Sequence, residues 1–209
     1  MPGLHRLPRT ASLPFYDDPL QSETIPIRPA IPLELILLCH AATRAMKTGR
    51  FPIGDEPAEH DARSQLAPLR ARGNARVIAS PARVARETAA WIADAFDIVP
   101  AFDDIDYGRW RGHSIRETGE REPEQVAAWL ADPHARAHGG ESVAMLAARV
   151  AEGLALIDRL KGCERCIVVT HAIVVKVALA QALGKPLTSV YAMNLAPLST
   201  TVLERATSV

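Results

Sequence analysis

Two histidines, His40 and His171, each follow directly on a short apolar run, and both are placed where a sheet would bind a ligand. The first run is Leu35–Cys39 and the second is Ile167–Thr170. Runs of this length without polar alternation fit strands that are buried on both faces of an α/β sheet. Ligands of such sheets bind just beyond the carboxyl ends of the strands. We therefore expect the two imidazoles to share one site, although they lie far apart in the chain.

An acidic and aromatic loop, residues 102–113, supplies the carboxylates that such a site would need. It contains Asp103, Asp104 and Asp106. One histidine can attack a phosphoryl group, the second can stabilise the charged intermediate, and a carboxylic acid can protonate the leaving oxygen. A phosphoryl site also needs cations or backbone donors that hold the phosphoryl oxygens.

The elements that position these residues alternate between strand and helix from residue 32 onward. The pattern predicts strands at 33–39, 76–79, 98–101, 166–170 and 200–203, and helices at 43–48, 63–72, 81–96, 122–131, 142–160 and 173–183. This alternation predicts an α/β fold, a three-layer α/β/α sandwich with a mostly parallel central sheet. Residues 1–31 are rich in proline and lack periodicity, which indicates an irregular arm before a domain at 32–209. We expect the arm to fold back on the domain or to cross to a second subunit of a homodimer.

The composition excludes several classes of protein. The 209 residues carry 24 basic and 24 acidic side chains, so the net charge gives no reason to expect bulk binding of nucleic acid or of an anionic membrane. No apolar run approaches the roughly 20 residues of a membrane helix. The N-terminal stretch lacks the apolar core of a secretory signal, so the cytoplasm is the expected compartment. The three cysteines argue against a disulfide framework, and parallel strands would hold Cys39 and Cys166 at opposite edges of the sheet.

The order of five short segments carries a family resemblance. The first is the strand followed by His40, with Thr43 three residues further on, and the second is Ser80-Pro81 before a helix that contains Glu-Thr-Ala. The third is the loop Asp-x-Asp-Tyr-Gly-x-Trp-x-Gly, which begins at Asp104. The fourth and fifth are His-Gly-Gly-Glu-Ser at 138–142 and Val-Thr-His-Ala around His171. This succession, over about residues 33–204, resembles the phosphoglycerate-mutase-like branch of the histidine phosphatase superfamily. Within that branch it is most similar to small bacterial phosphatases of the alpha-ribazole phosphatase kind.

The resemblance implies a reaction and a set of roles. It implies hydrolysis of a small phosphorylated metabolite through a phosphohistidine on His40, with His171 stabilising the intermediate and no metal or cofactor required. Thr43 matches a Thr or Ser of the family. Asp104 falls where the family has a glutamate that acts as the acid, and Asp106 is a second candidate for that role.

The departures from the family pattern fall on the arginines that would hold the phosphoryl group. Cys39 and Val84 occupy the two positions where the resemblance implies arginine. Each lost charge-assisted contact costs roughly 1.5–3 kcal/mol, and guanidinium forks are the bidentate anchors of phosphate. We therefore expect weak activity or an unusual substrate. The nearby arginines that could substitute are Arg44, Arg50, Arg83 and Arg86, and Cys39 itself would face the substrate.

Two alternatives remain open from the residues. Cys39 beside His40, with His171 and a carboxylate near, offers metal-ligand types, and a cysteine beside an activating histidine can itself be a nucleophile. The second alternative is a non-catalytic family member whose pocket binds a ligand or a partner. Retention of both histidines favours the enzyme, whereas loss of both arginines favours the binding protein.

Overall fold

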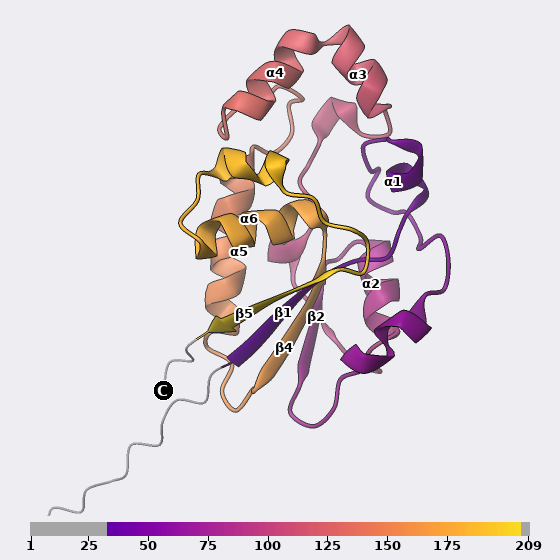
Figure 1. Cartoon of the computed structure of the whole chain (residues 1–209), viewed down its shortest axis with the longest axis vertical. Helices are drawn as coiled ribbons and strands as arrows, with labels where there is room; N and C mark the ends of the chain where they lie inside the picture. The colour runs from indigo at the N-terminus through magenta and orange to yellow at the C-terminus, as the bar shows by residue number, and fades with distance from the viewer. Residues whose placement is uncertain (1–32, 206–209) are drawn as a thin grey trace, which may run out of the picture.

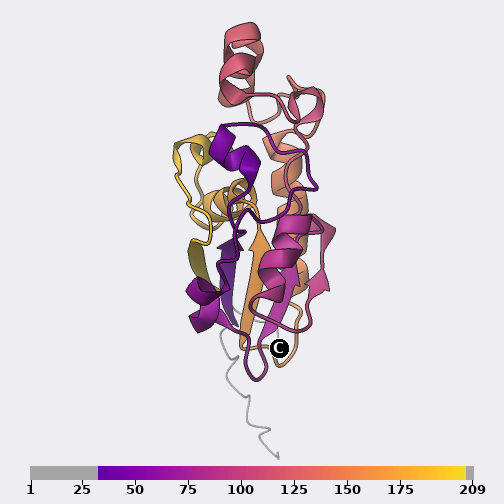
Figure 2. The same ribbon diagram turned by 90° about the vertical axis from the view of Figure 1, so that its right-hand side faces the viewer.

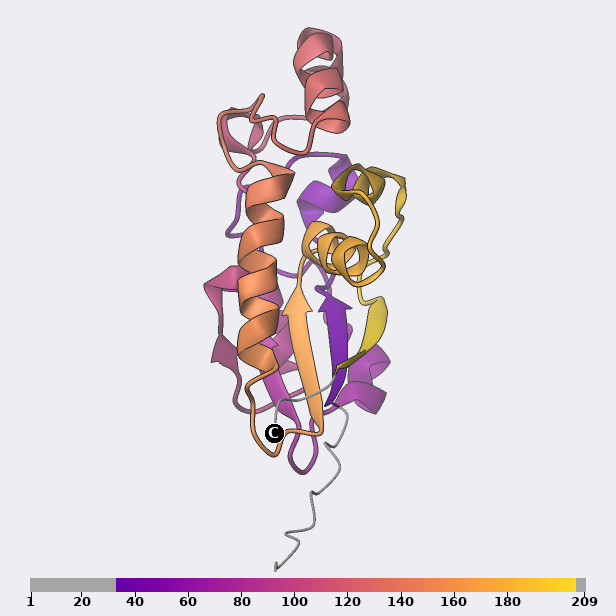
Figure 3. The same cartoon turned by 90° about the vertical axis from the view of Figure 1, so that its left-hand side faces the viewer.

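A five-stranded sheet forms the centre of the computed structural model, which describes residues 33–205. The strands are β1 (Leu33–Cys39), β2 (Arg76–Ala79), β3 (Asp97–Ile98), β4 (Arg165–Thr170) and β5 (Thr200–Arg205), in the spatial order β3-β2-β4-β1-β5. All neighbours pair in parallel except β1 and β5, which pair antiparallel. Figure 3 shows β1 and β4 pointing the same way, with β5 beside β1. The prediction of a mostly parallel sheet is confirmed.

Helices cover both faces of this sheet, which makes the predicted three layers. One face carries α5 (Val143–Ile157) and α6 (Ala172–Ala182), and the other carries α2 (Arg83–Ala90). The remaining helices are α1 (Arg44–Thr48), α3 (Ile115–Arg121) and α4 (Pro123–Ala131). In Figure 1 and Figure 2, α3 and α4 stand at the end of the molecule toward which β1 and β4 point.

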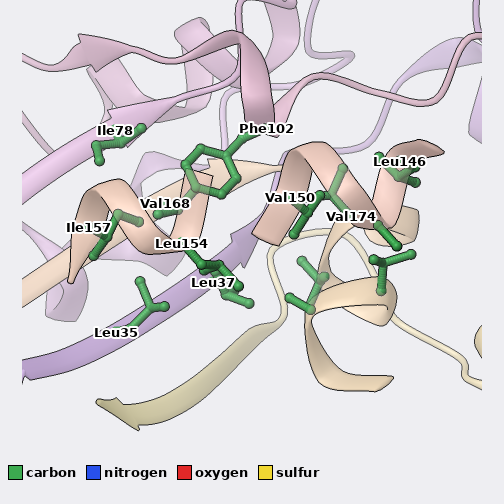
Figure 4. Packing of buried hydrophobic residues seen from close by; sticks show 14 of the residues in the cluster. Leu35, Leu37, Ile78, Phe102, Leu146, Val150, Leu154, Ile157, Val168 and Val174 are labelled. Atoms are coloured by element: carbon green, nitrogen blue, oxygen red, sulfur yellow. The ribbon is translucent and has the colours of Figure 1, made fainter. Parts of the chain in front are cut away.

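The apolar run of β1 packs in two directions. Leu35 and Leu37 lie in one hydrophobic cluster with the buried residues of α5 and α6, as Figure 4 shows for Leu154 and Ile157. Ile36 and Leu38 belong to the cluster on the α2 side. A strand that is covered on both faces has no position for a polar side chain, and this explains the continuous apolar run in the sequence.

Several predicted boundaries are wrong. The helix predicted over 81–96 begins at Arg83 and ends at Ala90. The strand predicted over 98–101 is only Asp97–Ile98, because Pro100 opens a short 3-10 turn. Helix α3 was not predicted, although Ser114 caps it by accepting a hydrogen bond from the Glu117 amide at 3.3 Å. A Ser with Glu three residues later is a known start signal for a helix.

Two further expectations from the sequence concern the N-terminal arm and membrane-spanning helices. The proline-rich arm predicted at 1–31 lies outside the described residues. Across residues 33–205, no helix has the length and hydropathy needed to cross a bilayer.

Candidate active site

The register of the sheet brings His40 and His171 together at the carboxyl ends of β1 and β4. Cys39 is paired with Thr170, so the residues that follow them are neighbours, and the His40 amide donates to the Thr170 carbonyl at 2.8 Å. The two ring centroids are 4.8 Å apart, with the planes at 73°. Both side chains line one cavity of about 290 Å³, although each residue is nearly buried. The edge position inferred from the two strand ends is where the structure places them.

The hydrogen bond of His40 assigns its tautomer. Its Nδ1 lies 2.7 Å from the carbonyl oxygen of Ala41, which can only accept, so Nδ1 carries the proton. In the neutral ring the lone pair is then on Nε2. The Ala41 amide in turn donates to Thr88 Oγ1 at 3.1 Å, which ties the turn after β1 to helix α2. Burial, with His171 as a second cause, lowers the pKa of His40 to about 4, so the ring is neutral and nucleophilic at pH 7.

His171 is held by Ser80, which follows β2. The Ser80 hydroxyl donates to Asp103 Oδ1 at 3.0 Å and lies 2.8 Å from His171 Nε2. Because a serine hydroxyl has one proton, the Nε2–H of His171 donates to Ser80 Oγ in this arrangement. Burial lowers the pKa of His171 to about 4. Ser80 is itself fully buried, so it positions the ring and is not reachable as a nucleophile.

Asp104 faces the other nitrogen of His171. Its Oδ2 lies 3.5 Å from His171 Nδ1, and its side chain is 20% exposed against 46% for Asp103. Burial raises the pKa of Asp104 to about 6. A carboxyl group with a raised pKa beside an imidazole with a lowered one can hold and release a proton near neutrality. Asp106, the other acid that the sequence left open, does not line the cavity and pairs with Arg111 at 3.3 Å.

Arg149 of α5 fixes the loop that carries these carboxylates. Its guanidinium donates to the backbone carbonyls of Ala101, Asp103 and Asp104 at 2.8–3.0 Å. It also forms a bidentate pair with Glu141, at 2.7 and 2.8 Å. Since the bonds go to the main chain on both sides of Asp103, they set where the two carboxylates stand relative to His171.

Two glycines let this loop lie directly against the segment before α5. A Cβ on Gly108 would come within 2.2 Å of the His138 carbonyl oxygen, and one on Gly140 within 2.0 Å of the Asp106 carbonyl oxygen. Gly108 also has φ +49°, which disfavours other residues. The glycines of the Asp-x-Asp-Tyr-Gly and His-Gly-Gly-Glu-Ser segments therefore serve one backbone contact between the two segments.

Of the other residues predicted to bind substrate, some line the cavity and others lie outside it. Thr43 and Arg50 line the cavity with the histidines. Arg44 does not line this cavity and lies in a neighbouring groove. The guanidinium of Arg83 does not line the cavity, because its Nε donates to Glu87 Oε1 at 2.8 Å along the exposed face of α2. Of these three arginines, only Arg50 lines the cavity.

Cys39 does not line the cavity, contrary to its prediction as a substrate-facing residue. It is 1% exposed at the end of β1. Burial raises the pKa of its thiol to about 12, so the thiolate that nucleophilic or metal-ligand chemistry requires does not form near neutral pH. Within residues 33–205, no cluster of three or more His, Cys, Asp or Glu side chains is arranged to hold a metal ion.

Sequence reasoning missed two charged residues of the cavity wall, Arg111 and Glu56. Arg111 follows a short 3-10 turn, Gly108–Trp110, and Arg109 in that turn pairs with Glu122 outside the cavity. Nothing in the sequence distinguishes the two arginines of this loop. Val84, which the resemblance places at an arginine position, lines the cavity, so the wall is apolar there.

The chain is similar to several known proteins. A sequence model described as Histidine phosphatase superfamily (branch 1) matches residues 35–208. The chain is 31% identical over 188 residues to the Bifunctional protein Rv2228c of Mycobacterium tuberculosis, covering 83% of this chain and 50% of that protein. It is 27% identical to Phosphoserine phosphatase 1 of Hydrogenobacter thermophilus, covering 78% of this chain and 82% of that protein. This chain therefore spans about half the length of the mycobacterial relative.

Several solved structures share this fold. The alpha-ribazole phosphatase from Shigella flexneri superposes with a TM-score of 0.69 at 21% identity, covering 84% of this chain and 96% of the other. The mycobacterial glucosyl-3-phosphoglycerate phosphatase Rv2419c, in complex with VO3, superposes with a TM-score of 0.67 at 20% identity, covering 83% and 98%. The family match over most of the chain, together with the paired histidines and the acid loop, shows that the chain belongs to the histidine phosphatase superfamily.

Proposed function

We propose that this protein hydrolyses phosphomonoesters through a phosphohistidine on His40. The observation that carries the proposal is the common cavity in which His40 Nε2 has a free lone pair, with His171 and Asp104 beside it. A cavity of about 290 Å³ suits a small phosphorylated metabolite. The cytoplasm, expected from the sequence, is the compartment we propose for it.

The reaction follows from the protonation states. His40 Nε2 attacks the phosphorus, and the bond from phosphorus to the leaving oxygen breaks while Asp104 gives that oxygen its proton. A water then attacks the phosphohistidine, its proton returns to Asp104, and the bond from phosphorus to Nε2 breaks to release phosphate. The negative charge of a bound phosphoryl group favours protonation of the neighbouring His171, whose ring centroid lies 4.8 Å from that of His40. The resulting imidazolium stabilises the charge on the transferred group.

The test is capture of the intermediate. Wild-type protein mixed with radiolabelled p-nitrophenyl phosphate and stopped in alkaline denaturant, because phosphohistidine is labile to acid, should carry label on the peptide that contains His40. The label should disappear on a chase with unlabelled substrate. Turnover with label on another residue would contradict the role of His40.

The non-catalytic alternative rests on the wall at Val84. A phosphoryl group between the two histidines would meet an apolar side chain there in place of a guanidinium. A protein that binds p-nitrophenyl phosphate or inorganic phosphate but shows neither label nor turnover would favour this alternative over hydrolysis.

Val84→Arg is expected to raise kcat/KM for p-nitrophenyl phosphate about 10- to 100-fold. The side chain starts from the first turn of α2 and lines the cavity, so a guanidinium can reach the phosphoryl oxygens. A charge-assisted contact worth roughly 1.5–3 kcal/mol corresponds to this factor. Cys39→Arg is the weaker choice, because Cys39 is buried behind the wall.

Val84→Met is the matched control, since it adds length without charge. Steady-state kinetics on the two variants, with melting curves to check folding, separates the charge from the added volume. If Arg is no better than Met, the lost guanidinium is not what limits this site.

A further inference from the structure

Thr88 is a fully buried residue of α2 that contacts the turn after β1 and does not line the catalytic cavity. Its hydroxyl donates to the Val84 carbonyl at 2.7 Å, four residues earlier in the helix. Its oxygen accepts a hydrogen bond from the Ala41 amide at 3.1 Å. A threonine hydroxyl has one proton, and here that proton is committed to Val84. Thr88 therefore serves the turn as a hydrogen-bond acceptor.

The peptide group that Thr88 holds is next to the one whose carbonyl binds His40. His40 Nδ1 lies 2.7 Å from the Ala41 carbonyl oxygen. The peptide group on the other side of this carbonyl is also fixed, because the Ala42 carbonyl accepts from the Glu59 amide at 2.9 Å. The direction of the Ala41 carbonyl therefore depends on two anchors, the Thr88 side chain and the Glu59 main chain. Substitution of a side chain can remove the first of them.

The acceptor at Nδ1 decides which nitrogen of His40 can attack phosphorus. In a neutral imidazole one nitrogen carries the proton and the other has the lone pair, and the hydrogen bond at one nitrogen sets which is which. With the proton on Nδ1, the lone pair is on Nε2, the atom that the proposed reaction uses. If the Ala41 carbonyl turns away, the proton can move to Nε2, and that nitrogen then has no lone pair for the attack.

On the basis of the proposed function, we infer that Thr88 is a positioning residue for the nucleophile. By accepting from the Ala41 amide, it sets the direction of the Ala41 carbonyl and so keeps the proton of His40 on Nδ1. Thr88 does not line the cavity in which the substrate would bind. Its effect on the reaction is therefore transmitted through the turn and appears in the protonation of His40.

Nitrogen-15 NMR of the imidazoles in the resting protein tests this inference directly. Burial lowers the pKa of His40 to about 4, so at pH 7 the ring is neutral and its two nitrogens give distinct signals. Wild type should show the proton on Nδ1, with the His40 signals assigned by their absence in His40→Gln. Thr88→Val, which has nearly the shape of threonine but no acceptor, should move the ring toward the Nε2–H tautomer. Thr88→Ser should keep the wild-type spectrum, and a wild-type spectrum in Thr88→Val would overturn the inference.

Steady-state kinetics should follow the spectra. Thr88→Val is expected to lower kcat for p-nitrophenyl phosphate about tenfold, the size expected for one lost hydrogen bond, because fewer molecules have the lone pair on Nε2. KM should stay nearly constant, since Thr88 does not line the cavity. Thr88→Ser restores the acceptor and should restore most of kcat. An equal loss of kcat in the two variants would show that the acceptor is not what matters, and would overturn the inference.

Thr118→Val is the matched control. Thr118 is a buried residue of α3 whose Oγ1 also donates to the carbonyl four residues earlier, that of Ser114, at 2.8 Å. It does not line the cavity. This variant removes the same kind of intrahelical bond, so it should lower the melting temperature and leave the His40 spectrum and kcat unchanged. A similar fall of kcat in Thr118→Val would assign the effect of Thr88→Val to general destabilisation and overturn the inference.

Thr88→Cys covers the case in which Thr88→Val does not fold. The valine leaves the buried Ala41 amide without a partner, which destabilises the protein. A thiol keeps an acceptor at this position, but a weaker one than a hydroxyl. Thr88→Cys should therefore give a mixture of the two His40 tautomers, and the wild-type tautomer alone would overturn the inference.

The spectra keep this inference separate from the proposed function, because they are recorded without substrate. If wild type forms the labelled phosphohistidine and Thr88→Val keeps the proton on Nδ1, the inference fails and the proposed function stands. If the tautomer of His40 depends on Thr88 and wild type neither carries label nor turns over, the proposed function fails and the role of Thr88 in holding the ring stands.

Discussion

His40→Ala is expected to reduce the hydrolysis of p-nitrophenyl phosphate to the uncatalysed rate, a loss on the order of a thousandfold or more. The reason is that the variant removes the atom that attacks phosphorus. His40 Nε2 has the free lone pair because Nδ1 is committed to the Ala41 carbonyl at 2.7 Å. Ser80 is fully buried and the thiol of Cys39 is protonated behind the wall.

Two further variants make the His40→Ala result interpretable. His40→Gln keeps a side-chain donor near the Ala41 carbonyl, so it separates loss of the nucleophile from a cavity in a buried position. His134→Ala changes an exposed histidine outside the cavity and should keep wild-type kinetics. Residual turnover of His40→Ala above one-tenth of wild type, with folding intact, would exclude His40 as the phosphoryl acceptor.

Asp104→Asn is expected to lower kcat for an alkyl phosphate such as glycerol 2-phosphate by roughly 100- to 10,000-fold, the usual contribution of a general acid. An alkoxide leaves poorly without a proton, and Asp104 is the less exposed of the two aspartates that line the cavity, 3.5 Å from His171. The loss should be much smaller for p-nitrophenyl phosphate, because nitrophenolate leaves without protonation. Steady-state kinetics on the two substrates measures this difference directly.

The pH dependence of kcat tests the same role. The acid must be protonated, so the rate with an alkyl phosphate should fall as pH rises through about 6, the raised pKa of Asp104. The nucleophile must be neutral, so the rate should fall as pH drops through about 4, the lowered pKa of His40. Asp104→Asn should abolish the limb near pH 6 and keep the limb near pH 4. The substrate's own phosphate ionisation is common to both proteins, so the difference between their profiles isolates Asp104.

Three carboxyl variants identify which acid is used. Asp104→Glu, which restores the residue typical of the family, should keep the limb near pH 6. Asp103→Asn should disturb the position of His171 through Ser80 but also keep this limb. Asp94→Asn, at a 95% exposed side chain, should change nothing. If Asp103→Asn removes the limb and Asp104→Asn does not, the acid is Asp103.

Local patterns in the sequence were sufficient to predict the order of strands and helices and the α/β class of the fold. The apolar runs at β1 and β4 are continuous because helices cover both faces of the sheet. Side chains that point to either face are buried, so apolar residues occupy successive positions. A histidine directly follows each of these strands. Parallel pairing places the carboxyl ends of the two strands at the same edge of the sheet. The two imidazoles could therefore be placed together without a structure, and the motif order identified the family.

Element boundaries were less predictable where turns compete with regular structure. Pro100 and the turn it opens cut β3 to two residues, and α2 ends at Ala90, short of the predicted Phe96. These ends depend on packing against neighbours that a local pattern does not describe.

What the sequence determined by itself is the α/β class and the shared edge for His40 and His171. The resemblance added the expectation that Cys39 and Val84 stand where the family has arginine. What only the tertiary structure decided is which side chains face the cavity: Arg50, Glu56, Arg111 and Asp104 do, whereas Arg83 and Cys39 do not. The physical reason is that strand order fixes where a residue's backbone lies. The direction of a side chain in a turn or a helix depends on contacts made by residues distant in sequence, such as Arg149 with the acid loop and Glu87 with Arg83.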